Sequence, residues 1–150
     1  MKKIILILTS VIVVCGLLTY YYLQNDKKMI YNFACYVTND STKLDEVINN
    51  YLLCDKNSKA ITLIQLEYIR KEYNKSPTNK IKVYSYQKAI EQKIIKETIV
   101  TEDYDNVYII FYNNQLQVPI LLNSDSKIIS ISTINKGEVR FFMRIDKRKS

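Results

Sequence analysis

The chain has 150 residues and a formal net charge of +7, with 47% hydrophobic and 25% charged residues. These proportions are ordinary for a globular protein, so they exclude wholesale disorder and leave room for one domain after a leader segment. The sequence contains no histidine and two glycines, which excludes Ser-His-Asp and Cys-His catalysis, removes the commonest metal ligand and leaves no glycine-rich phosphate loop.

The first predicted element is a membrane-spanning helix. Residues 4–23 are twenty residues without a charge, and at about 1.5 Å per residue they give about 30 Å of helix, the thickness of a bilayer's hydrocarbon core. Lys2 and Lys3 precede this segment and three tyrosines end it, which favours a cytoplasmic N-terminus and an extracytoplasmic domain. We therefore expect residues 1–24 to be a membrane anchor or uncleaved signal of a single-pass protein, with residues 4–23 contacting lipid.

Four alternatives compete with this anchor. A cleaved secretory signal would end near Cys15 or Gly16, where the sequence lacks the usual small residues. A lipoprotein would be acylated at Cys15, yet Val14 stands where a small residue is preferred. A pilin-type leader would need a glutamate five residues after Gly16 and has Tyr21 instead. A core helix of a cytosolic protein is rarely apolar on every face at this length.

Residues 25–40 form the predicted juxtamembrane segment. After a polar start, apolar side chains recur at helical spacing, at Ile30, Phe33, Ala34 and Val37. This spacing predicts a short helix that continues from the anchor, with a strand as the alternative. Turn-forming residues follow, and Thr42 stands three residues before Asp45, which predicts a capping box.

The domain proper is predicted over residues 41–146, and it begins with two helices. The first covers residues 43–53, where the apolar residues follow one helix face. The second covers residues 58–73 and carries apolar residues on several sides, so we expect it to be largely buried. Pro77 ends it.

The hydrophobic period then changes to that of strands. We expect a strand over 81–86, a short helix over 87–94, and strands over 96–101, 107–113, 115–122, 127–134 and 138–145, with turns at 113–114, 123–126 and 135–137. The run VYIIFY over 107–112 is apolar on both faces and should be central, whereas Pro119 places its strand at an edge or a bulge.

The expected fold class is thus α+β: an N-terminal transmembrane helix, then two or three helices packed on a curved antiparallel sheet of five to six strands. Residues 147–150 would form a basic tail. The element order over residues 41–145 is similar to that of the NTF2-like superfamily, although no motif residue carries the resemblance. It implies a cone-shaped sheet whose cavity serves isomerases and hydrolases in some members and binding or oligomerisation in others. A cystatin-like sheet wrapped on a helix is the structural alternative.

Few side chains indicate chemistry. Glu102, Asp103 and Asp105 could ligate a hard cation, but their spacing fits no calcium loop and a solvated turn is the simpler interpretation. Glu67 would have a raised pKa if it faced a pocket, although exposure or pairing with Arg70 or Lys71 is simpler. We predict no catalytic, cofactor-binding or metal-binding residue.

The tyrosines and cysteines leave alternatives open. Thirteen tyrosines could line a cavity that binds without catalysing, or could replace tryptophan in an ordinary core. Cys35 and Cys54 either form a disulfide that closes a loop of about 20 residues or remain as buried free thiols.

These observations predict a membrane-tethered extracytoplasmic binding or interaction domain that is not an enzyme and needs no cofactor. Its partner would be an envelope protein, a second copy of the chain or a small ligand, and not nucleic acid. One alternative is a small NTF2-like enzyme that uses carboxylates and tyrosines in its cavity. Another is a membrane-surface module that acts through the basic residues Arg140, Arg144 and 147–149.

Overall fold

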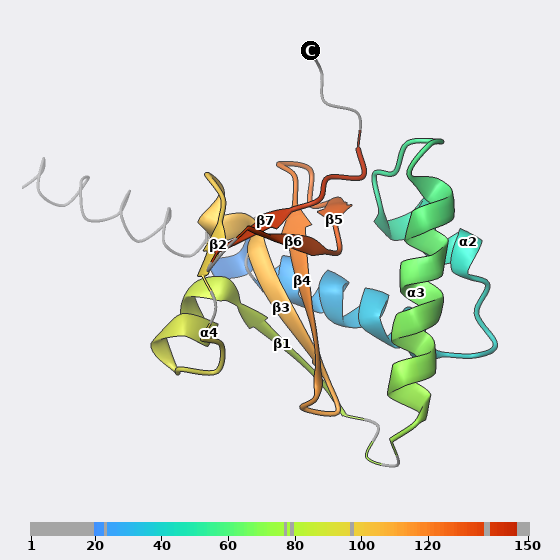
Figure 1. The fold of residues 1–150 in the computed structure, drawn as a ribbon, viewed down its shortest axis with the longest axis horizontal. Helices are drawn as coiled ribbons and strands as arrows, with labels where there is room; N and C mark the ends of the chain where they lie inside the picture. Colours follow the sequence, from blue (N-terminus) through green and yellow to red (C-terminus); the bar gives the residue numbers. More distant parts are fainter. Residues whose placement is uncertain are drawn as a thin grey trace, which may run out of the picture.

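The computed structural model describes residues 20–22, 24–76, 78, 80–96, 98–136 and 139–146. Over these residues the chain has an α+β fold in which helices pack against antiparallel sheets (Figure 1). No helix within the described residues is long and apolar enough to cross a membrane. Most of the predicted span over residues 4–23, and the whole basic tail over 147–150, lie outside the described residues.

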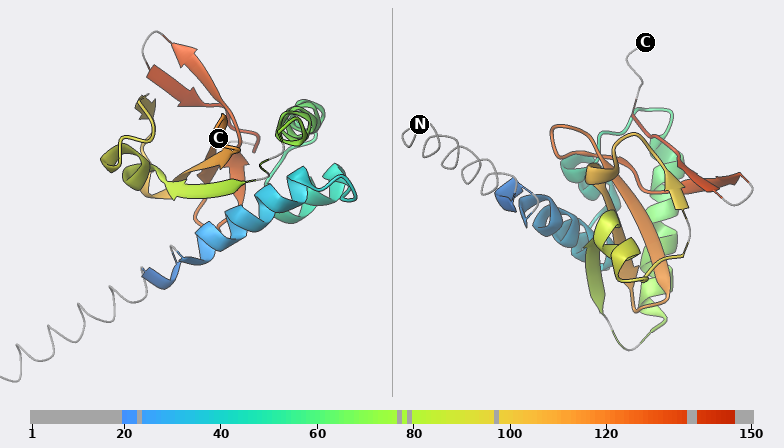
Figure 2. Two further views of the ribbon diagram at one scale, coloured as in Figure 1. Left: turned by 90° about the horizontal axis from the view of Figure 1, so that it is seen from below. Right: turned by 90° about the vertical axis from the view of Figure 1, so that its left-hand side faces the viewer.

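The first described helix covers residues 24–38. Its side chains Ile30, Phe33, Ala34 and Val37 are all 0% exposed. The helical spacing of these residues therefore predicted the element correctly, and the strand alternative is wrong. Figure 2 shows this helix, in blue, running beneath the strand drawn in light green, so that its apolar face covers one side of the main sheet.

Helix α2 (Leu44–Tyr51) and helix α3 (Lys59–Asn74) follow, as the apolar spacing predicted. The capping box is wrong, because Lys43 occupies the N-cap position of α2 and its side chain makes no capping hydrogen bond. The expectation that α3 is largely buried is also wrong. Its buried residues are Thr62, Leu66 and Ile69, whereas a second apolar side of the helix faces outward.

Arg70 joins the three helices. Its Nε donates to the carbonyl oxygen of Val37 at 2.7 Å, and its Nη2 donates to that of Thr42 at 2.8 Å. The Val37 carbonyl lies in the last turn of the first helix, where backbone acceptors have no partner within the helix. The Thr42 carbonyl lies just before α2. One side chain of α3 therefore holds the end of the first helix and the lead into α2.

The remaining elements are β1 (Ile81–Ser85), α4 (Tyr86–Glu91), β2 (Thr98–Val100), the 3-10 helix η1 (Tyr104–Asn106), β3 (Val107–Tyr112), β4 (Leu116–Leu122), β5 (Ile128–Ser130), β6 (Thr133–Lys136) and β7 (Val139–Phe142). They form a four-stranded sheet in the order β1-β3-β4-β5 and a three-stranded sheet in the order β2-β7-β6. The prediction of one antiparallel sheet is wrong, since there are two sheets and β2 pairs with β7 in parallel.

The predicted strand over 127–134 is divided between these sheets. It breaks after Ser130, a buried residue whose hydroxyl bonds to the carbonyl oxygens of Ser132 at 2.9 Å and Met143 at 2.6 Å. These side-chain hydrogen bonds satisfy backbone acceptors where the chain leaves the main sheet. The same hydrophobic run thus contributes β5 to one sheet and β6 to the other.

Strand β3 is central, as the run VYIIFY predicted, and all six of its residues are buried. Tyr108, Ile110 and Tyr112 face the helices and belong to one hydrophobic cluster. The alternate residues Val107, Ile109 and Phe111 belong to a second cluster on the opposite face, with residues of α4 and the three-stranded sheet. The core therefore consists of two layers, separated by the main sheet.

Pro119 does not place its strand at an edge, because β4 lies between β3 and β5. In an antiparallel sheet, the N–H and C=O groups of successive residues point alternately to the two neighbouring strands. By this alternation the nitrogen of Pro119 points toward β5 and not toward β3. There β5 pairs with Leu121 and Leu122 only, so no ladder bond is lost. A register irregularity does occur between Leu121 and Leu122, as the bulge alternative suggested.

The turn at Asn113–Asn114 is also confirmed. Both residues have left-handed backbones, with φ of 56° and 58°, a conformation that asparagine tolerates better than most residues. The Asn113 side chain accepts from the Lys80 N–H at 2.8 Å and donates to the Tyr73 carbonyl at 3.0 Å. The turn therefore binds the end of α3 to the start of β1.

Candidate functional site

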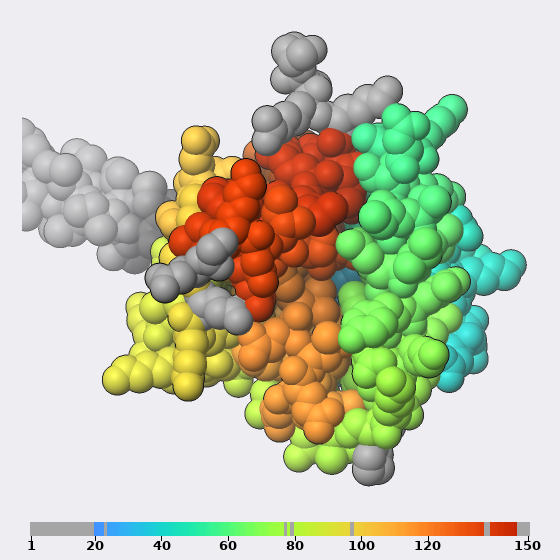
Figure 3. All heavy atoms as spheres, viewed as in Figure 1, coloured from blue at the N-terminus to red at the C-terminus, as the bar shows by residue number. Residues whose placement is uncertain are grey.

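A groove with a volume of about 790 Å³ lies between α3 and β6. Helix α3 forms one wall, the strand β6 with its preceding residues forms the other, and β4 forms the floor. Figure 3 faces this side of the molecule, with α3 in green beside β6 and β7 in orange-red. We call this feature the α3–β6 groove.

The α3 wall presents apolar side chains to solvent. Ile64 and Tyr68 are 65% and 56% exposed and stand four residues apart, so they lie one above the other on the helix surface. Across the groove, Ile134 of β6 is 44% exposed. Apolar side chains gathered on both walls of a groove are typical of a binding surface, because isolated exposed residues would not converge in this way.

The β6 wall presents backbone groups. Strand β6 pairs with β7 alone among the described strands and forms the edge of its sheet. Because the Met143 N–H donates to the Ser132 carbonyl at 3.0 Å, the antiparallel alternation turns the N–H and C=O groups of Thr133 and Asn135 away from β7. Such an edge is a template for another extended chain.

A polar group lies between the two walls. Gln65 of α3 donates from Nε2 to the Ser132 hydroxyl at 3.1 Å, while its Oε1 is buried with no hydrogen-bond partner within the described structure. A buried acceptor without a partner costs about 1 to 3 kcal/mol. Arg140 also lines the groove, and no carboxylate is found among its described lining residues.

The predicted cation ligands do not converge. Glu102 and Asp103 are exposed at the turn before η1, and Asp105 is exposed within η1. Asp105 Oδ1 accepts a hydrogen bond from Gln87 Nε2 at 2.7 Å. The described residues contain no cluster of three or more acidic, histidine or cysteine side chains that could hold a metal ion. Glu67 is exposed on α3, which confirms the simpler interpretation. Arg70, one of its two alternative partners, donates instead to the carbonyls of Val37 and Thr42.

The carboxylate and tyrosine groups meet in one smaller cavity of about 230 Å³, lined in part by Glu72, Tyr73 and Tyr112. Glu72 is bound to Lys75 at 2.5 Å, so its carboxylate is engaged at the surface. Burial raises the pKa of Tyr112 far above its usual range. A neutral phenol and a paired carboxylate make a poor acid and base at neutral pH.

Most tyrosines on strands serve the core. Tyr108 and Tyr112 are 1% exposed, and their hydroxyls have no hydrogen-bond partner among the described residues. Burial raises the pKa of Tyr108 to about 12. The interpretation that tyrosine replaces tryptophan in the core is thus confirmed for these two, while Tyr68 lines the groove.

Cys35 and Cys54 are free thiols, so the disulfide is wrong. Both side chains are half-buried, so the free thiols are confirmed but their full burial is not. Cys54 Sγ donates to the Asp55 carbonyl at 3.4 Å and lies 3.6 Å from the Thr62 hydroxyl. Among the basic residues near the C-terminus, Arg144 is paired with Asp146 at 2.6 Å. Cys15 and the lysines at 147 and 149 lie outside the described residues.

Sequence reasoning missed the groove residues, although one signal for them existed. The apolar residues on several sides of the segment 58–73 exceed what a single buried face requires. The surplus was interpreted as burial, whereas Ile64 and Tyr68 form an exposed wall. The free edge of β6 left no signal, because the sequence does not show that its hydrophobic run divides between two sheets.

No protein-family model matches this chain, and comparison with curated proteins and with solved structures found no significant match either. The NTF2-like resemblance therefore stays a prediction from the order of the elements.

Proposed function

We propose that this protein is a membrane-tethered extracytoplasmic binding domain that recognises an extended segment of a partner envelope protein in the α3–β6 groove. The proposal rests on two features that face each other across one groove. One is the edge of β6, which has no further partner among the described strands, and the other is the exposed apolar side of α3. The tether comes from the uncharged residues 4–23.

An extended peptide suits this groove better than a compact ligand. Its backbone would pair with the outward N–H and C=O groups of Thr133 and Asn135, in the manner of an added strand. Alternate side chains would then point toward Ile64 and Tyr68 on α3. This arrangement provides affinity through the backbone and selectivity through side chains, and it requires no reacting group.

Charge narrows the chemistry of the partner segment. Lys136 ends β6, and Arg140 lines the groove from the neighbouring strand β7. The exposed Lys136 places a positive charge at this end of the groove, and none of the described residues that line the groove is acidic. We therefore propose that the partner segment carries apolar residues at alternate positions and an acidic residue near the β6–β7 turn.

The tether is tested by expressing the chain with a C-terminal tag and measuring its mass in the membrane fraction. We expect the full-length mass, together with protease sensitivity of the tag from the outer side only. A product that lacks the first 15 or so residues, or a tag that is protected outside and cleaved inside, would overturn the tether.

The groove is tested with peptides selected from a random library on the full chain in neutral detergent. The double variant Ile64→Ser and Tyr68→Ser should weaken these peptides at least about tenfold, since each buried apolar contact is worth about 1.5 to 3 kcal/mol. Bound peptide should also slow hydrogen exchange at the Thr133 and Asn135 amides.

The matched control is Ile61→Ser, on the same helix and 48% exposed but outside the lining of the groove. It should leave peptide affinity unchanged. Peptides that bind the double variant as tightly as the parent chain, or that leave exchange at Thr133 and Asn135 unaltered, would contradict the proposed site.

A further inference from the structure

A second groove, of about 650 Å³, lies between the first helix and β1 on the opposite edge of the molecule from the α3–β6 groove. It is lined by Gln24, Asn25, Lys27, Lys28, Tyr31, Ile81, Lys82, Val83 and Tyr84. Three of these residues are lysines and none of them is acidic. We call this feature the β1 groove.

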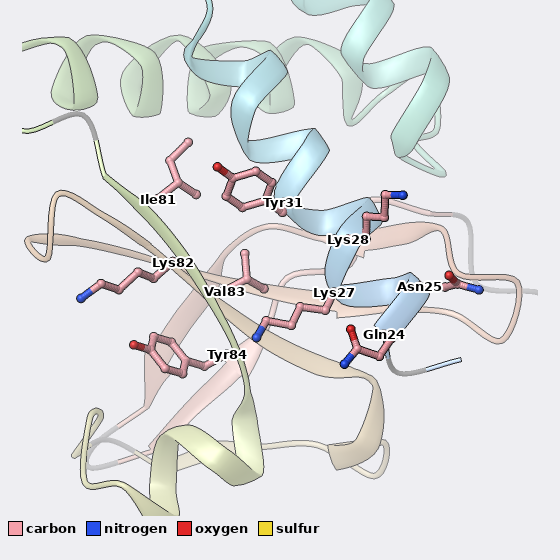
Figure 4. Close-up of a pocket in the computed structure, with 9 residues that line it drawn as sticks. All are labelled: Gln24, Asn25, Lys27, Lys28, Tyr31, Ile81, Lys82, Val83 and Tyr84. Carbon is pink, nitrogen blue, oxygen red and sulfur yellow. The ribbon is translucent and has the colours of Figure 1, made fainter. Parts of the chain in front are cut away.

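The lysines that line the β1 groove come from both elements, but only Lys27 reaches across it. In Figure 4, Lys27 reaches from the helix toward β1, Lys28 stands at the helix side, and Lys82 leaves β1 on the far side. All three side chains are exposed. The positive surface continues past the groove, where Lys27 and Lys88 line an adjoining cavity of about 170 Å³. Asp26 is half-buried and is not among the residues that line either feature.

The backbone of β1 adds hydrogen-bonding groups. The Asn113 N–H donates to the Lys80 carbonyl at 2.8 Å, so the alternation along the β1–β3 pair turns the N–H and C=O groups of Ile81 and Val83 away from β3. No other described strand pairs with β1 on that side. An oxyanion would find N–H donors there beside the Lys27 ammonium group, and hydroxyl groups would find carbonyl acceptors.

We propose that the β1 groove binds the headgroup of an anionic phospholipid, with the phosphate at the lysines and the β1 amides. The proposal rests on the tether in the proposed function. The uncharged segment ends at residue 23, and Lys27 and Lys28 follow it by four and five residues. At about 1.5 Å per residue, this places them about 6 to 8 Å beyond the segment, within the headgroup region of a bilayer.

This position favours a lipid over an acidic peptide, which could also pair with the free edge of β1. A tether that ends beside the groove keeps headgroups at high local concentration, whereas a peptide would have to displace them. Lysines held close to a bilayer surface also attract anionic head groups electrostatically. The groove would thus set the orientation of the domain on the membrane and leave the α3–β6 groove accessible.

The test uses the isotope-labelled full chain in neutral maltoside micelles, titrated with short-chain phosphatidylglycerol while the amide resonances of Ile81 and Val83 are followed. We expect saturable shifts at these amides that weaken with added salt, and no such shifts with short-chain phosphatidylcholine. Glycerol phosphate and an acidic extended peptide are titrated as separate probes. Equal or tighter binding of either one would overturn the assignment to lipid.

The variant Lys27→Gln with Lys82→Gln should weaken phosphatidylglycerol about 25-fold, at roughly fivefold for each lysine near the surface. The matched control, Lys56→Gln with Lys71→Gln, removes the same charge from exposed positions outside the groove and should have little effect. Equal losses in both variants would mean a general charge effect and would overturn the proposal, as would no loss in either.

A third variant separates this proposal from the peptide site. Ile64→Ser with Tyr68→Ser should weaken peptide binding in the α3–β6 groove at least about tenfold and leave the lipid titration unchanged. If the intact mass shows a cleaved leader, the tether fails while the titration still reports whether the groove itself binds the headgroup.

Discussion

The two faces of strand β3 are built from the same six-residue run and differ in what covers them. On one face, Tyr108, Ile110 and Tyr112 meet three helices and join a cluster of twenty buried residues. On the other, Val107, Ile109 and Phe111 meet α4 and the three-stranded sheet in a cluster of eight, with partly buried residues such as Phe142 at its rim.

This difference shows that alternation along a strand predicts burial but not the quality of the packing. The helix face is covered by three helices and holds the larger cluster, so its atoms can relax less after a loss of volume. The opposite face is covered by one short helix and short strands, among them β6 with its exposed outer edge. The α3–β6 groove borders the larger cluster, because Ile69, Val118 and Ile131 of that cluster line it.

The largest expected loss of stability is that caused by Ile110→Ala. Ile110 is 0% exposed within the larger cluster, so its truncation should lower the free energy of unfolding by about 2 to 5 kcal/mol, toward the upper end of that range. Ile109→Ala, on the other face of the same strand, should cost less, because the rim of its cluster can move inward. Denaturant unfolding of both variants measures the difference, and a larger loss for Ile109→Ala would reverse the comparison.

Arg70→Met should lower the free energy of unfolding by about 1.5 to 3 kcal/mol. Methionine keeps an apolar stem of similar length but removes the two donors to Val37 and Thr42, leaving two carbonyls at the junction of the helices without their partners. Thermal and denaturant unfolding both report the change. Lys71→Met, one residue along and exposed, is the control, and equal behaviour of the two variants would mean that the junction does not depend on Arg70.

Alkaline pH should lower the free energy of unfolding, because Tyr108 and Tyr112 on the helix face of β3 are buried. Burial raises the folded-state pKa of Tyr108 to about 12 and raises that of Tyr112 further. The unfolded chain ionises near pH 10 and then binds fewer protons than the folded chain, so stability is fully present below about pH 10 and falls above it. The slope should be about 1.4 kcal/mol per pH unit for each of these tyrosines.

The variants Tyr108→Phe and Tyr112→Phe sharpen this test. Each should flatten the alkaline slope and cost less than about 1 kcal/mol at neutral pH, because the hydroxyls have no hydrogen-bond partner among the described residues. Unfolding midpoints across pH 8 to 11 measure both effects. An unchanged slope in the double variant would place the titrating groups elsewhere.

The local pattern of the sequence was enough to locate most helices and strands. The 3.6-residue spacing at Ile30, Phe33 and Val37 identified a helix whose apolar face is buried, and VYIIFY identified a strand buried on both sides. The asparagine pair at 113–114 identified a turn, because few other residues accept its left-handed backbone. These features depend on interactions between residues that are close together in the chain, so local sequence patterns are enough to predict them.

What the local pattern could not decide were the contacts between distant segments. Whether one side of a helix is buried depends on what packs against it. The many apolar residues of α3 therefore predicted burial, whereas Ile64 and Tyr68 form an exposed wall of the α3–β6 groove. Pro119 looked like an edge residue, but β5 ends before reaching it. The tertiary structure alone decided the division of residues 127–134 between two sheets, because the Ser130 hydroxyl bonds carbonyls that only the folded chain brings together.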